Sequence, residues 1–115
     1  MLLKEGDKVL LAHRRLFAGD TIRYFVGRVD GYENGLIKVT GQSYVRDLVH
    51  GGVAEKSEIR TKILSLSSGT LIVYQLPDET QLDRLNFLAE EGHLVLSDGD
   101  RLVMNLTESM HGGRI

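Results

Sequence analysis

Short turn signals divide this chain into brief apolar segments, and their spacing constrains the fold more than any other feature. The sharpest signal is Asn34-Gly35, because both residues tolerate the positive φ angles of a type I′ turn. It lies between residues 23–29 and 36–40, which are rich in aromatic and β-branched side chains. This arrangement predicts a mainly β chain in which antiparallel hairpins follow one another.

Strand candidates recur along the chain between the turn signals. We expect strands at residues 8–13, 23–29, 36–40, 58–66 and 70–76. Gly27, inside the second of these, leaves room for a bulge or a sharp bend. Residues 41–52 fit an irregular strand or one helical turn equally well. Asp98-Gly99 predicts a further hairpin at about residues 93–107.

One helix is predicted, at about residues 78–91, directly after Pro77. Asp78 and Gln81 stand at the spacing of a capping box, in which each side chain satisfies a free backbone N–H at the helix start. Apolar residues then recur at helical spacing and a glycine follows as a stop signal: Leu82, Leu85, Leu88, Ala89 and Gly92.

The length of 115 residues is that of one domain, and 42% hydrophobic and 26% charged residues are typical of a globular protein. We expect residues 1–108 to form a single domain and residues 109–115 to be a mobile tail. The chain has no cysteine, which excludes disulfides and fits a reducing compartment. Neither a signal peptide nor an apolar run of about 20 residues is present, so we expect a cytoplasmic protein without a membrane partner.

The sequence contains no motif that indicates a catalytic, cofactor-binding or metal-binding site. None of the four histidines stands at helical or strand spacing from another, so no metal pair is indicated. The carboxylate pair Asp98 and Asp100 fits turn chemistry. The segment 41–45 begins a Gly-x-Ser-x-Gly nucleophile motif but ends in valine. We therefore predict a non-catalytic protein and keep an enzyme of unknown class as the last alternative.

Charge is distributed unevenly along the chain, whose net charge is −2. Residues 1–66 carry 11 of the 14 lysines and arginines against eight acids, whereas residues 67–115 carry three against eight. Aromatic residues interleave with the basic ones in the first part, a mixture that suits single-stranded RNA or DNA because cations neutralise phosphates and aromatic faces stack on bases. The basic residues are His13, Arg14, Arg15, Arg23, Arg28, Lys38, Arg46, Arg60 and Lys62, and the aromatic ones are Tyr24, Phe25, Tyr32 and Tyr44.

Residues 27–39 resemble the first motif of the Sm-like proteins: a glycine and an apolar residue, an aromatic–acidic pair, and an apolar strand. Residues 59–63 are similar to the second motif, which in the family usually reads Ile-Arg-Gly. The resemblance covers residues 6–66 and implies a small, strongly bent five-stranded antiparallel barrel, of the Sm-like or SH3-like kind, that assembles into rings and binds RNA. Gly35 and Ile37 stand where the family has its base-stacking residue and its base-contacting asparagine, and Thr61 replaces a glycine.

Together these observations predict a mainly β fold: a small bent barrel with one helix and an added C-terminal hairpin. The apolar strands at residues 70–76 and 101–107 have little to cover them in so small a domain, so we expect a homo-oligomer. The leading hypothesis is a non-catalytic binding or assembly module without a cofactor. The alternative is a weak RNA or single-stranded DNA binder, and its candidate residues are Arg14, Arg15, Arg28, Tyr32 and Arg60.

Overall fold

The chain forms two antiparallel β-sheets, which belong to two compact units, Met1–Asp78 and Glu79–Ile115. The structure is a computed structural model that describes residues 3–13, 22–46, 53–55, 58–90, 93–99 and 102–106. The mainly β fold predicted from the turn spacing is confirmed. Arg14, Arg15 and the tail at residues 109–115 lie outside the described residues.

The sheet of the first unit has the strand order β4-β3-β2-β1-β6, with β5 also paired to β3. All five strands predicted in this unit are found, two of them longer and two shorter than expected, and a short strand that was not predicted, β4, is added. The strands are β1 (Lys8–His13), β2 (Ile22–Glu33), β3 (Leu36–Arg46), β4 (Val53–Glu55), β5 (Arg60–Ser65) and β6 (Leu71–Gln75). Along the described chain β5 and β6 each pair on one edge only, so the sheet does not close into a barrel.

The β2–β3 hairpin turns at Asn34-Gly35, as predicted. Glu33 pairs with Leu36 across the turn, and the φ angles of 50° at Asn34 and 78° at Gly35 are both positive, as a type I′ turn requires. Beyond residue 40 the strand β3 continues to Arg46, so the first half of the ambiguous segment 41–52 is a strand. Residues 47–52 lie outside the described part of the chain.

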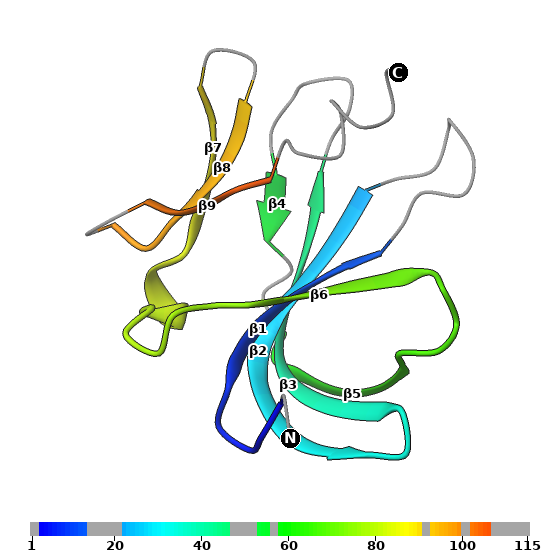
Figure 1. The fold of residues 1–115 in the computed structure, drawn as a ribbon. Helices are drawn as coiled ribbons and strands as arrows, with labels where there is room; N and C mark the ends of the chain where they lie inside the picture. Colours follow the sequence, from blue (N-terminus) through cyan, green and yellow to red (C-terminus); the bar gives the residue numbers. More distant parts are fainter. Residues whose placement is uncertain are drawn as a thin grey trace. The chain divides into compact units, whose positions relative to one another are not determined.

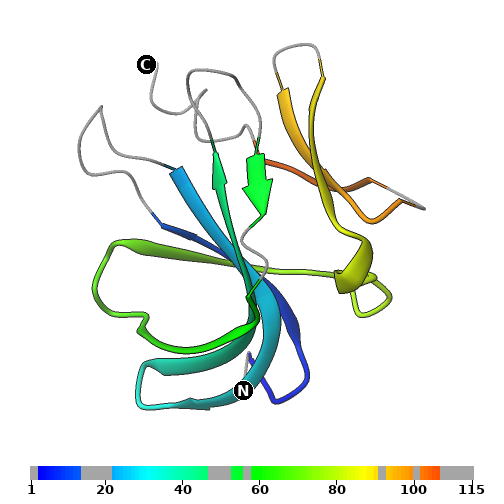
Figure 2. The ribbon, with the colours of Figure 1, turned by 180° about the vertical axis from the view of Figure 1, so that it is seen from behind.

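The hairpin bends where two glycines face each other. Gly27 on β2 pairs with Gly41 on β3, and a Cβ built on Gly27 would lie 2.1 Å from the carbonyl oxygen of Thr40. The two backbones therefore approach too closely for a side chain. Figure 1 shows β2 and β3 curving together from the β4 end down to the turn, and Figure 2 shows the same curve from behind. The register shift lies further along, between Val29 and Gly31.

Successive side chains of a strand point to opposite faces of the larger sheet. We call the face that carries the core cluster the inner face. This cluster consists of Val9, Leu11, Phe25, Val29, Ile37 and Val39, all at most 1% exposed. Leu64 and Val73, from β5 and β6, pack against it. The opposite, outer face carries buried Leu10 and Tyr24 but also exposed Arg28. The core of the first unit thus lies along the inside of the bend.

The predicted helix at residues 78–91 is wrong. Only Leu82–Arg84 form a single turn of 3₁₀-helix (η1), and an extended strand β7 (Asn86–Glu90) follows. Instead of a helix cap, Gln81 donates its backbone N–H to the carboxylate of Asp98 at 3.2 Å. Burial in this segment alternates as in a strand, because Leu85 is buried, Asn86 exposed, Phe87 half-buried and Leu88 exposed. Cross-strand pairing then outweighs helix propensity.

The second unit is a three-stranded sheet in the order β7-β8-β9. Its strands β8 (His93–Ser97) and β9 (Leu102–Asn105) pair antiparallel, so the hairpin predicted at residues 93–107 is confirmed. Leu94, Val95 and Leu96 of β8 are buried, as are Leu85 and the polar residues Thr80 and Asp98.

No described helix has the length and apolar character needed to cross a membrane.

Candidate anion-binding site

Two basic side chains of β5 belong to the inner face of the larger sheet. Arg60 lies opposite Gly41 and Lys62 opposite Val39 on β3. Directly opposed residues of an antiparallel pair point to the same face, and Val39 is a core residue. The alternation along β5 therefore directs both cations toward the interior of the bend, next to the core cluster.

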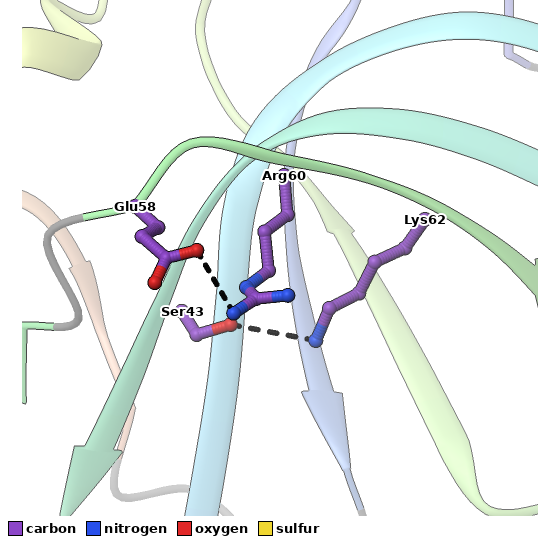
Figure 3. A network of polar contacts seen from close by, with 4 residues as sticks. All are labelled: Ser43, Glu58, Arg60 and Lys62. Atoms are coloured by element: carbon purple, nitrogen blue, oxygen red, sulfur yellow. Dashed lines mark hydrogen bonds and ion pairs between the residues drawn. The ribbon is translucent and has the colours of Figure 1, made fainter.

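Lys62 extends across the inner face from β5 toward the strands β3 and β2. Its Nζ donates a hydrogen bond of 3.4 Å to the hydroxyl of Ser43 on β3 and lies 4.6 Å from the ring centroid of Phe25 on β2. The second distance is that of a cation–π contact. Figure 3 shows Arg60 and Lys62 side by side, with Lys62 reaching to Ser43. The ammonium group is thus held at the boundary between the apolar core and solvent.

His13 and Arg23 bring two more basic side chains to this end of the inner face. They oppose each other at the ends of β1 and β2, and Arg23 is two residues from Phe25 along the same strand face. Burial lowers the pKa of His13, and the positive charges of Lys62 and Arg23 lower it further. The pKa of Lys62 is also lowered, first by burial and then by Arg60 and Arg23. The four side chains therefore repel one another.

We call His13, Arg23, Arg60 and Lys62 the basic cluster. One acidic side chain accompanies it: Glu58 forms an ion pair of 3.0 Å with Arg60 (Figure 3), and both groups are largely exposed. Exposed pairs of this kind contribute little to stability. Within the described residues no carboxylate is paired with Arg23 or Lys62. The cluster therefore has an excess of positive charge that an anionic group could neutralise.

The residues proposed from the sequence for nucleic-acid binding do not lie together. Arg60 belongs to the basic cluster. Arg28 lies on the outer face. It pairs with Thr40 on β3, which lies opposite Thr61 on β5, and Thr61 is the neighbour of Arg60 and therefore points to the other face of the sheet. Tyr32, 39% exposed, pairs with Ile37 at the turn end of the hairpin. Ile37 and Ser43 are six residues apart on β3, so about 20 Å of extended strand separates Tyr32 from Ser43, the hydroxyl that Lys62 contacts.

The sequence interpretation did not select His13, Arg23 or Lys62 as site residues, although all three are in its list of basic residues. These residues could have been selected from the strand periodicity of two, which shows which side chains share a face. Arg60, Lys62 and Leu64 share one face of β5, and Arg23 shares a face of β2 with Phe25. Arg28 and Tyr32 were selected instead from the mixture of basic and aromatic residues in the first part of the chain, and that mixture does not indicate which face of a strand a side chain occupies.

A scan against protein-family models found no match, and searches of curated proteins and of solved structures found none either. Among the described residues no group of three or more His, Cys, Asp or Glu side chains could hold a metal ion. The chemistry that the described arrangement supports is the electrostatic binding of an anion.

Proposed function

We propose that this chain is a non-catalytic binding module that takes an anionic partner on its basic cluster. The observation that carries the proposal is the convergence of four basic side chains, from three different strands, on one end of the inner face. Single-stranded RNA or DNA is the partner class that we favour, because Arg and Lys side chains recognise phosphate groups through charge and hydrogen bonds.

The electrostatics of the cluster support binding rather than a purely structural role. Like charges held together raise the free energy of the empty site, and a bound anion removes this repulsion. Ser43 adds a hydroxyl that can donate a hydrogen bond to a phosphate oxygen. Half-buried side chains such as Lys62 are also screened less by salt than fully exposed ones.

The proposal is tested by titrating the protein into fluorescently labelled random-sequence RNA and single-stranded DNA, at low and at physiological salt. We expect binding that weakens steeply as salt rises, because bound phosphates release condensed counterions. Affinity that does not change with salt, or no binding at low salt, would contradict the proposal.

Two matched substitutions separate the basic cluster from the rest of the surface. Arg60→Gln removes a cation of the cluster, whereas Arg28→Gln removes an exposed arginine from the outer face of the same sheet. We expect Arg60→Gln to weaken binding about tenfold, the effect of one lost charge-assisted hydrogen bond, and Arg28→Gln to leave it nearly unchanged. Equal losses would place binding outside the inner face.

We also propose that the first unit is an open variant of the small SH3-like or Sm-like barrels. Its support is the strongly bent antiparallel sheet in which five strands follow the order β6-β1-β2-β3-β5, together with the motif resemblance of residues 6–66. An experimental structure of the chain would test this topology directly.

Self-association is a second proposal, and the exposed isoleucines of the β5 segment favour it. Ile59, just before β5, is 72% exposed, and Ile63, on β5, is 65% exposed. Among the described residues, β5 has one unpaired edge. Such an edge can pair with a further strand. Sedimentation should show an oligomer that Ile63→Glu dissociates, whereas a monodisperse wild-type monomer at every concentration would contradict the proposal.

A further inference from the structure

Lys62 is the member of the basic cluster that interacts with the other three. Burial lowers the pKa of Lys62, Arg60 and Arg23 lower it further, and the charge of Lys62 lowers the pKa of His13. The Nζ atom of Lys62 contacts the hydroxyl of Ser43 and lies over the Phe25 ring. The cluster therefore brings several hydrogen-bond donors within electrostatic reach of the Lys62 ammonium group.

The pairing of β3 with β4 and β5 is interrupted beside Ser43. β5 begins at Arg60, opposite Gly41, and β4 pairs with β3 only from Tyr44 onward. Ser43 lies in the interval where neither of these two strands pairs with β3. The side chains of Arg60 and Lys62 reach over this interval (Figure 3), so a ligand group of phosphate size could replace the long contact between Lys62 and Ser43.

Among the residues that the structure describes, no exposed aromatic ring lies at the cluster. The nearby ring of Phe25 is 1% exposed and has Lys62 over its face. Tyr32, which is exposed, pairs with Ile37 next to the hairpin turn. The described side chains of the site therefore offer a ligand positive charge and hydrogen-bond donors.

We infer that the basic cluster binds a phosphomonoester, such as the terminal phosphate of an oligonucleotide, in preference to the phosphodiesters of a backbone. A phosphomonoester carries about −1.5 to −2 charges near neutral pH on three acceptor oxygens, whereas each phosphodiester carries one charge. Several basic side chains that reach one phosphate group match the charge of a phosphomonoester. The successive single charges of a phosphodiester backbone would instead be matched by basic side chains spaced along it. This inference rests on the proposed anion-binding function and specifies its ligand.

The first arm of the test compares two labelled oligonucleotides of one sequence, with a 5′-phosphate and with a 5′-hydroxyl. We expect the phosphorylated one to bind about tenfold more tightly, the effect of additional charge-assisted hydrogen bonds. Lys62→Met should remove this difference, whereas Lys38→Met, an exposed lysine on the outer face, should preserve it. Arg60→Gln, at an exposed position, repeats the test where Lys62→Met fails to fold.

The second arm uses small molecules and distinguishes the source of the phosphate. Methyl phosphate and dimethyl phosphate are titrated separately while the imidazole signal of His13, assigned with His13→Gln, is followed by NMR. We expect methyl phosphate alone to raise the pKa of His13, because a bound dianion stabilises the charged imidazolium. Binding of methyl phosphate without an effect of the 5′-phosphate would support a small phosphorylated ligand and exclude the oligonucleotide end.

The two proposals fail in different ways. Salt-sensitive binding of both oligonucleotides with equal affinity would overturn the phosphomonoester inference and leave the anion-binding function intact. No binding of either oligonucleotide, together with no response of His13 to methyl phosphate, would overturn both.

Discussion

Replacing Gly27 by alanine tests whether the close approach of β2 and β3 is the feature that bends the larger sheet. The added Cβ would lie 2.1 Å from the carbonyl oxygen of Thr40 and 2.8 Å from the Cα of Gly41. Both atoms belong to the backbone of the paired strand, so no side-chain rotation can relieve the overlap. Overpacking a closely packed interior costs about 1–3 kcal/mol, and we expect the upper end, ~3 kcal/mol, because the backbone itself must move.

This cost corresponds to a Tm lower by roughly 15 °C for a unit of this size. The measurement is urea and thermal unfolding followed by far-UV circular dichroism, since the chain contains no tryptophan to report by fluorescence. Gly31→Ala is the matched control on the same strand, because a Cβ there meets nothing within 4 Å. We expect that control to change stability by less than about 1 kcal/mol. Equal stability of Gly27→Ala and Gly31→Ala would refute the pairing of the two glycines.

Four further predictions follow from single residues. Gly35→Ala should lower the free energy of unfolding by about 1–2 kcal/mol, because φ is 78° at this turn position; an unchanged urea midpoint would argue against the type I′ turn. Asp7→Ala should destabilise by about 1–3 kcal/mol, because the buried carboxylate accepts a backbone hydrogen bond of 3.0 Å; calorimetry measures the effect. The lowered pKa of His13 means that the unfolded chain binds more protons, so stability should rise with pH from below that pKa to about 6.5, and His13→Gln should flatten the rise in unfolding experiments. Lys62, whose pKa is lowered, should acetylate at a lower pH than exposed Lys38, and equal labelling by mass spectrometry would contradict the electrostatic interpretation.

The hairpins of this fold were predictable because their signals are local. The Asn34-Gly35 turn depends on the φ angles of two neighbouring residues, and the flanking strands have the matching composition. The close approach of Gly27 to Gly41 was harder to predict. The sequence indicated that the chain could bend at Gly27, but the register that places the two glycines opposite each other depends on the whole hairpin.

The helix prediction failed although the apolar residues had the spacing of a helix. Leu82, Leu85 and Leu88 recur at helical spacing, yet Leu88 is 43% exposed in the structure while Leu85 is buried. The strand at residues 86–90 pairs along its length with β8, and these cross-strand bonds stabilise the extended conformation. Asp98, which accepts a hydrogen bond from the Gln81 N–H, is 17 residues away in the sequence, so this contact could not be predicted from local spacing.

The basic cluster was only partly predictable, because its assembly depends on which residues of β3 pair with β4 and which pair with β5. β3 pairs with β5 up to Gly41 and with β4 from Tyr44, so Ser43 lies in the interval between them. The change of partner strand occurs next to Gly41, where the absence of a side chain lets β2 and β3 approach each other closely. The cluster therefore depends on the glycine pair as well as on its own charges. A variant that separates the strands at Gly27 should weaken anion binding even though all four basic side chains are retained, so one substitution links the stability and the binding measurements.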